Sequence, residues 1–163
     1  MPGVAVYAGS FDPPTNGHVW MIEQGAALFD RLVVAVGVNP AKKPAYTLEK
    51  RIAWLRAITS QHRNVEVATF GNLFLAYYAA QIGASFILRG IRSEADFPYE
   101  QTMRHINADL SPGITTVFLM PPREIAEVSS SLVRGTVGPE GWQSVVRKYV
   151  PACVFDDLVK SHA

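Results

Sequence analysis

Cysteine is nearly absent from this sequence of 163 residues, which holds a single one at position 153. Cys153 has no partner for a disulfide within the chain and no cysteine or histidine at metal-ligand spacing, so we expect a buried structural thiol. Long apolar runs are also missing: no segment approaches the length that spans a bilayer, and the N-terminus lacks a basic region followed by an apolar signal core. These absences favour a cytoplasmic protein.

An excess of charge of either sign is missing as well. The chain has 15 lysines and arginines against 14 aspartates and glutamates, a formal net charge of +1. This balance gives no general field that would attract nucleic acid or an anionic membrane, so an anion must be bound by a few local basic residues. We therefore expect a small phosphorylated ligand.

Several catalytic patterns are missing too. The sequence has no pair of carboxylates at hydrolase-like positions, no Gly-x-x-x-x-Gly-Lys-Ser/Thr and no Gly-x-Ser-x-Gly. These absences argue against a P-loop nucleotide hydrolase and against a serine hydrolase. Because no cluster of cysteines and histidines has metal-ligand spacing, no metal bound by protein side chains is predicted.

Apolar segments of two kinds alternate along the chain. Short runs typical of strands lie at 4–7, 32–38, 65–68, 85–88 and 115–120. Segments with helical periodicity lie at 19–29, 48–59, 73–82 and 95–110. This alternation predicts an α/β fold, a single Rossmann-like domain over residues 1–163 with a five-stranded parallel sheet and helices on both faces. Residues 137–163 contain glycine and proline breaks and are expected to form a short helical tail packed on the sheet.

The most informative segment, residues 8–18, follows the first strand, where ligands of such sheets bind. Gly9 permits close approach of a ligand to the backbone, and Ser10 supplies a hydroxyl. His18 falls in the first turn of the next helix, where free N–H groups favour an anion. We therefore predict a phosphate site in which His18 donates to a phosphoryl oxygen.

Basic residues follow the second and fourth predicted strands. Lys42 and Lys43 compete for one role, that of a mobile ammonium group that reaches the same crevice. Arg89 and Arg92 flank Gly90, which allows close backbone approach, and we expect the two arginines to bind different phosphates.

Two further groups have alternative roles. Glu100, on the predicted helix after the fourth strand, either accepts a hydrogen bond from a ribose hydroxyl or orients an arginine. Ser129, Ser130 and Ser131 follow the fifth strand, and they either bind a second part of a polyphosphate or simply cap the next helix.

Six motifs occur in a characteristic order: Gly-Ser-Phe-Asp-Pro-x-Thr-Asn-Gly-His (9–18), Asn-Pro-x-Lys (39–42), Arg-Gly-Ile-Arg (89–92), Asp-Phe-x-Tyr-Glu (96–100), Phe-Leu-Met-Pro (118–121) and Ser-Ser-Ser-Leu-Val (129–133). Over residues 4–134 the chain resembles the bacterial phosphopantetheine adenylyltransferases, a family of the nucleotidyltransferase superfamily with a Rossmann-like sheet. Thr15 stands where many other members of the superfamily carry the first histidine of His-x-Gly-His. This difference favours the phosphopantetheine family over the nicotinate mononucleotide enzymes.

The resemblance implies that ATP and 4′-phosphopantetheine react to dephospho-coenzyme A and pyrophosphate, with Mg²⁺ bridging phosphates, in coenzyme A biosynthesis. It makes Ser10, His18 and Lys42 catalytic: His18 donates to the α-phosphoryl group, while Ser10 and Lys42 hold the attacking phosphate. The residues implied to bind phosphopantetheine are Ser10, Lys42, Leu75, Arg89 and Asn107. The residues implied to bind ATP are Gly9, Ser10, Phe11, His18, Gly90, Ile91, Arg92, Glu100, Ile125, Ala126, Glu127, Val128, Ser129, Ser130 and Ser131.

The resemblance also implies a homohexamer and leaves feedback by coenzyme A open. Two positions depart from the family pattern: Ala8 stands where proline is common, and Pro98 lies near the start of a predicted helix. Two other functions remain as alternatives. One is another adenylyl- or cytidylyltransferase of the superfamily, and the other is a non-catalytic nucleotide sensor, which would be expected to lack His18, Lys42 or Arg92.

Overall fold

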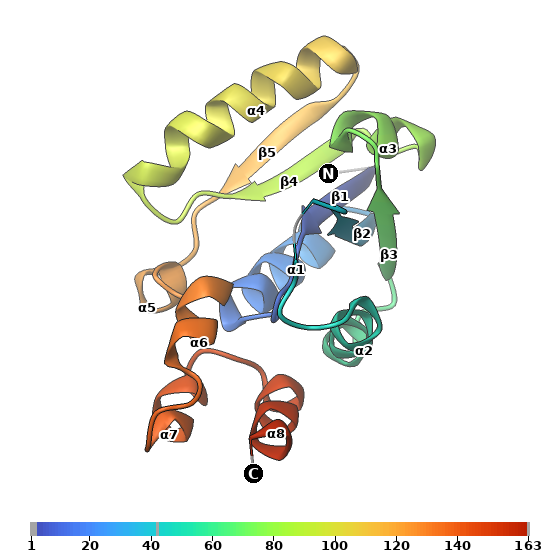
Figure 1. Ribbon diagram of the computed structural model, residues 1–163. Coiled ribbons are helices and arrows are strands. Elements are labelled where there is room, and N and C mark those ends of the chain that lie inside the picture. The colour runs from blue at the N-terminus through green and yellow to red at the C-terminus, as the bar shows by residue number, and fades with distance from the viewer. Residues whose placement is uncertain (1–2, 42, 163) are drawn as a thin grey trace.

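The computed structural model describes residues 3–41 and 43–162, which form a parallel β-sheet with helices around it (Figure 1). The strands are β1 (Val4–Gly9), β2 (Arg31–Val38), β3 (Val65–Gly71), β4 (Phe86–Gly90) and β5 (Thr115–Leu119). They lie side by side in the order β3-β2-β1-β4-β5. The five predicted strands are confirmed. Some extend further at their carboxyl ends, where glycines such as Gly9 and Gly71 still pair with β2 although they carry no apolar signal.

The helices that connect the strands are α1 (Asn16–Leu28), α2 (Leu48–Thr59), α3 (Leu75–Gln81) and α4 (Phe97–Leu110), the last preceded by a single 3₁₀ turn, η1 (Glu94–Asp96). The four predicted helices are therefore present. Helix α1 begins three residues earlier than its apolar periodicity does, because Thr15 is its N-cap. Pro98 is accommodated because it lies in the first turn of α4, where a missing N–H costs little.

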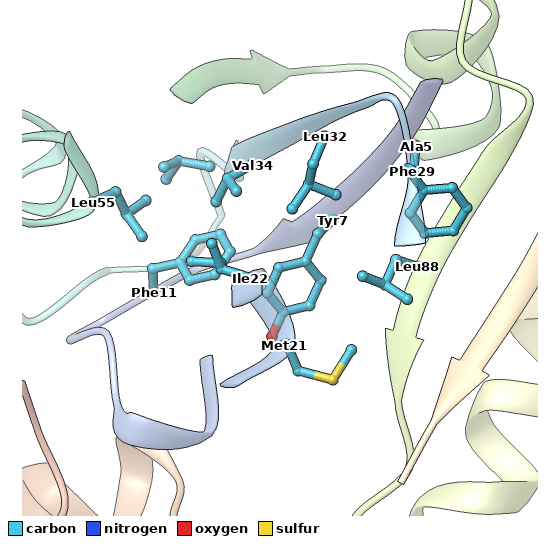
Figure 2. Close-up of a cluster of buried hydrophobic side chains, with 11 residues drawn as sticks. Ala5, Tyr7, Phe11, Met21, Ile22, Phe29, Leu32, Val34, Leu55 and Leu88 are labelled. Atoms are coloured by element: carbon cyan, nitrogen blue, oxygen red, sulfur yellow. The ribbon is translucent and has the colours of Figure 1, made fainter. Parts of the chain in front are cut away.

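The core has two layers, one on each face of the sheet. Successive side chains of a strand point to opposite faces, so β1 contributes Ala5 and Tyr7 to one layer and Val6 and Ala8 to the other. The first layer lies beneath α1 and α2 (Figure 2). In it the fully buried Leu55 of α2 packs with the strands, and burial of such a side chain contributes about 1.5–3 kcal/mol. The second layer lies beneath α3.

The carboxyl-terminal part consists of α5 (Arg123–Ala126), α6 (Ser130–Thr136), α7 (Trp142–Val146) and α8 (Ala152–Ser161). Contrary to the expectation, the tail packs on α2 and not on the sheet: Trp54 of α2 joins Trp142 and Phe155 in a separate apolar cluster. The Trp54 indole Nε1 also donates to Asp157 at 2.9 Å. Both faces of the sheet are already covered by other helices, which leaves α2 to receive the tail. Cys153 is half-buried at the edge of this cluster, and burial raises the pKa of its thiol.

The chain changes direction across the sheet at β1. It runs outward from β1 through β2 to β3, and then returns to the other side of β1 with β4 and β5. The connections that follow β1 and β4 therefore run in opposite directions across the sheet. Open α/β sheets bind ligands at the carboxyl ends of the strands at such a point. None of the helices within the described residues is long and apolar enough to cross a membrane.

Candidate active site

Two cavities open at the carboxyl ends of the strands, one on each side of the β1 end. The first cavity, about 350 Å³, lies between the ends of β1 and β4 and is bordered by the starts of α1 and α6. The second cavity, about 650 Å³, lies between the ends of β1, β2 and β3 and the start of α3. Four residues line both cavities, and we call them the shared wall: Ala8, Gly9, Ser10 and Arg89.

His18 lies in the first turn of α1 and lines the first cavity. Its Nδ1 accepts a 2.9 Å hydrogen bond from the backbone N–H of Thr15, so the proton of the neutral ring is on Nε2. Burial, and to a smaller extent the charge of Arg92, lower the pKa of His18 to about 4. At neutral pH the imidazole is therefore an uncharged Nε2–H donor at this cavity.

The loop before α1 holds an unusual backbone conformation. Phe11 has a φ of 48°, in the left-handed region that a residue other than glycine keeps only when its surroundings hold it there. Its ring is fully buried and meets the ring of His18 edge-on, with the centroids 5.0 Å apart. Phe11 therefore supports His18 from the core side. Its predicted contact with ATP would be restricted to the backbone.

Arg89, at the end of β4, is held by a carboxylate. Its Nε donates to Glu100 at 2.8 Å, its Nη2 forms a second, very short hydrogen bond to the same carboxylate, and its Nη1 donates to the Ala8 carbonyl at 3.3 Å. Glu100 comes from α4 and is buried. Of the two roles expected for Glu100, the geometry matches the orientation of an arginine. This ion pair fixes the guanidinium group in the shared wall.

Arg92 is paired in a similar way, but nearer to solvent. Its Nε and Nη2 each donate to the Asp96 carboxylate at 3.0 Å, and its backbone N–H does so at 2.9 Å. The hydrogen bonds from Arg92 lower the pKa of Asp96. Both predicted phosphate ligands thus carry a carboxylate partner, and a bound polyphosphate would compete with Asp96 for the more exposed of the two.

The three consecutive serines line the first cavity at the start of α6. Ser129 caps this helix, because its hydroxyl accepts a 3.1 Å hydrogen bond from the N–H of Leu132. Ser130 donates to the Pro13 carbonyl at 2.8 Å, and Ser131 accepts from Arg134 at 3.2 Å. The capping role is therefore present, and the serines also face the cavity where a second phosphate group was expected.

The structure brings most of the other predicted residues to these cavities. Gly9, Ser10, Gly90, Ile125 and Val128 line the first cavity, and Ser10, Leu75 and Arg89 line the second. Ala126 and Glu127 line a third cavity of about 490 Å³ beside Arg92. Ile91 and Asn107 are not among the residues that line the three, and Asn107 is buried in α4. Lys42 lies outside the described residues, so its role stays a prediction.

Two residues that the sequence did not indicate fasten the loop of residues 9–15. The buried carboxylate of Asp12 accepts hydrogen bonds from the N–H groups of Ala45 at 2.8 Å and Tyr46 at 2.9 Å. Arg134, which lines the first cavity, donates to the Asp12 carbonyl and lies 3.8 Å from its carboxylate. An Asp-Pro pair is typical of an exposed turn, so the burial of Asp12 could not be predicted from the sequence.

Metal-ligating side chains are not gathered anywhere in the described part of the chain, where no group of three or more histidines, cysteines, aspartates or glutamates could hold an ion. The acidic residues nearest the first cavity, Asp96 and Glu100, are both engaged by arginines. A divalent cation at this site would therefore need phosphate oxygens as ligands.

The sequence matches the cytidylyltransferase-like family over residues 6–136, which is most of the chain. It is 55% identical over 161 residues to a protein of Neisseria meningitidis serogroup B named phosphopantetheine adenylyltransferase, with 99% of this chain and 95% of that protein covered. A protein of the same name from Caldanaerobacter subterraneus is 43% identical over 157 residues, with 96% of each chain covered.

The fold has solved counterparts at much lower sequence identity. The nicotinic acid mononucleotide adenylyltransferase of Plasmodium falciparum, in complex with NaAD, matches with a TM-score of 0.70 over 99% of this chain and 96% of that chain, at 13% identity. At this identity the likeness concerns the fold alone. Taken with the matches to sequences, the chain belongs to the cytidylyltransferase-like family and, within it, to the phosphopantetheine adenylyltransferases.

Proposed function

We propose that the chain transfers the adenylyl group of ATP to 4′-phosphopantetheine and so forms dephospho-coenzyme A and pyrophosphate in coenzyme A biosynthesis. The relatives that carry this name match nearly the full chain at 43% to 55% identity. The observation that carries the proposal is the neutral ring of His18, whose free Nε2–H belongs to the cavity bounded by the shared wall.

The two cavities suit the two substrates. The first has Arg92, the three serines and the start of α1, all of which favour a polyphosphate. The second has an apolar lining that suits the extended arm of phosphopantetheine, together with two side-chain amides that can pair with the amides of that arm. The apolar residues are Phe70, Leu73, Phe74 and Leu75, and the amides are Asn39 and Asn72. With the substrates in these cavities, their reacting phosphates would meet at the shared wall.

The chemical step is an in-line displacement at the α-phosphorus of ATP. An oxygen of the phosphopantetheine phosphate, held at Ser10, forms a new bond to this phosphorus. The bond from the α-phosphorus to the oxygen that bridges to the β-phosphorus breaks, and pyrophosphate leaves with the electron pair. The attacking phosphate is already an anion at neutral pH, so no general base is required.

His18 contributes where negative charge gathers in the transition state. Its Nε2–H donates to a non-bridging oxygen of the α-phosphoryl group, and the ring needs no proton exchange because it is neutral throughout. Lys42 is proposed, from the sequence resemblance alone, as the second ligand of the attacking phosphate. Catalysis then comes from positioning and charge stabilisation, which fits a site without a carboxylate pair.

We treat Mg²⁺ as part of the MgATP substrate, carried by phosphate oxygens. A cytoplasmic location remains a proposal that rests on the sequence pattern, and feedback by coenzyme A one that rests on the resemblance. For a homohexamer there is one supporting observation: large apolar side chains are exposed on α3, on α4 and just before α3. Tyr77 and Phe97 line none of the three cavities, whereas Phe74 and Tyr99 also line the second cavity, so the support comes from Tyr77 and Phe97.

Pyrophosphate release tests the proposed function. The purified protein is given ATP or CTP together with 4′-phosphopantetheine, nicotinate mononucleotide or a polyol phosphate, and the nucleotide product is identified by mass spectrometry. We expect turnover with ATP and 4′-phosphopantetheine, and dephospho-coenzyme A as the product. Turnover with a different pair would assign another activity of the superfamily, whereas nucleotide binding without turnover of any pair would indicate a sensor.

A further inference from the structure

Arg51, on α2, is a buried cation behind the shared wall. Only 4% of its surface is exposed, and it is not among the residues that line the cavities. Its Nη1 donates to the carbonyl of Ser10 at 2.7 Å, and its Nε makes a long contact of 3.4 Å to the carbonyl of Thr47. No ion pair among the described residues involves Arg51.

A buried guanidinium group without a carboxylate partner is unusual and unfavourable. Removing a charge from water is costly, and the two carbonyl oxygens accept hydrogen bonds from the guanidinium group without neutralising it. The contrast with Arg89, Arg92 and Arg134 is direct, since each of these has a carboxylate within ion-pair distance. The positive charge of Arg51 therefore remains available to an anion on the other side of the loop.

The contact with Ser10 also sets the direction of a peptide group. In a trans peptide the C=O and N–H point in opposite directions, and the only cis bond among the described residues is Asp12-Pro13. Because the Ser10 carbonyl points to Arg51, the N–H of Phe11 points away from α2. The backbone hydrogen bonds of the described loops include none from this N–H.

The backbone at this point needs such a constraint. Phe11 holds a positive φ of 48°, and Ser10 is exposed, so the side chain of Ser10 does not anchor the loop in the core. Burial of the Phe11 ring fixes one side of the strained residue. The hydrogen bond from Arg51 fixes the peptide group on its other side.

We propose that Arg51 is a positioning residue for adenylyl transfer. By holding the Ser10 carbonyl it directs the Phe11 N–H and the Ser10 hydroxyl to the reacting phosphates, and its unpaired charge makes the same place favourable for an anion. The inference rests on the proposed function, because it assigns Arg51 to the phosphate transfer at the shared wall. Arg51 acts through Ser10 and Phe11 and does not itself touch a substrate.

The test compares Arg51→Gln and Arg51→Lys with Arg56→Gln. Arg56 lies on the same helix but is exposed, so it is a matched control. We expect kcat of Arg51→Gln to fall by roughly tenfold or more, with a smaller change in KM, because a misdirected peptide group costs most in the transition state. Arg51→Lys keeps the charge and one donor, and its kcat should lie between those of the wild type and Arg51→Gln. Arg56→Gln should match the wild type.

Folding is followed by circular dichroism and thermal unfolding, and ATP binding by calorimetry. A folded Arg51→Gln with wild-type kcat would overturn the inference, as would equal losses in Arg51→Gln and Arg56→Gln. If Arg51→Gln does not fold, Arg51→Lys decides: an unchanged kcat overturns the inference, and a reduced kcat at wild-type thermal stability supports it. Failure of the proposed function is distinguished by the wild type, which would then not turn over ATP with 4′-phosphopantetheine in the pyrophosphate-release assay. The same variants would be compared with the acceptor that the wild type does use, or by ATP affinity if there is none.

Discussion

The backbone N–H of Thr15 and the Nδ1 atom of His18 lie 2.9 Å apart in a hydrogen bond at the start of α1. This contact fixes both the orientation of the imidazole and the nitrogen that carries its proton. The backbone of Thr15 thus determines which nitrogen of His18, a residue that lines the first cavity, is free to donate.

Replacement of His18 by alanine should lower kcat by about two or more orders of magnitude, because a donor to the transition state is lost. Steady-state assay of pyrophosphate release measures the effect. His105→Ala is the control, since His105 is exposed on α4. The mechanism would be wrong if folded His18→Ala kept the wild-type kcat.

Protonation of His18 should make stability depend on pH. Its pKa is about 4 in the folded protein and 6.5 ordinarily, so between these values the unfolded chain binds a proton that the folded protein does not. The free energy of unfolding should therefore decrease as the pH falls from 6.5 towards 4. Above pH 6.5 the ring is neutral in both the folded and the unfolded chain, so His18 causes no loss of stability there. Urea unfolding of the wild type and of His18→Gln at about pH 7 and about pH 5 measures the part of this loss that is due to His18. An equal loss of stability in both proteins would contradict the shifted pKa.

Replacement of Asp12 by asparagine should reduce the free energy of unfolding by about 1–3 kcal/mol, because one of two partly buried backbone N–H groups loses its acceptor. It should also raise KM for phosphopantetheine, since Asp12 fastens the segment around Ala45 that follows Lys42. Urea unfolding and substrate titration measure these effects. The exposed Asp109→Asn is the control, and equal behaviour of the two variants would show that Asp12 does not brace the loop.

The two arginine–carboxylate pairs should differ in their contribution to stability. Glu100 is buried, so Glu100→Gln leaves the charge of Arg89 without its partner and should cost about 3–5 kcal/mol. In the other pair the Arg92 side chain is 45% exposed, and Asp96→Asn should cost about 0–1 kcal/mol. Urea unfolding of both variants makes the comparison. Similar losses would mean that burial does not set the energetics of these pairs.

Much of the fold could be predicted because its apolar pattern is local. Alternation of short apolar runs with helical periods placed the strands, and α2 was predicted with the observed limits of 48–59. The position of the tail could not be predicted. It depends on the contact of Trp54 with Trp142 and Phe155, and such contacts between distant apolar residues leave no periodic signal.

In the candidate site, too, residues near strand ends could be predicted and contacts between distant residues could not. Gly9, Ser10, His18 and Arg92 follow strands in the sequence and line one cavity, because parallel strands bring their carboxyl ends to one edge. Of the partners that hold the site, Glu100 was foreseen as one of two alternatives, and Asp12 and Arg134 could not be predicted. Asp12 and Arg134 are separated by 122 positions, and neither belongs to a pattern that specifies the other.

The shared wall also bears on inhibition. Under the proposed reaction, dephospho-coenzyme A would place its nucleotide in one cavity and its arm in the other. Between the two cavities lies the backbone of Gly9 and Ser10, which lines both. Two groups joined by a covalent link bind with a high effective concentration, provided that the link matches the distance it must span. A bisubstrate compound with an uncleavable linker of that length should therefore bind far more tightly than either half alone, and the width of the wall sets the linker.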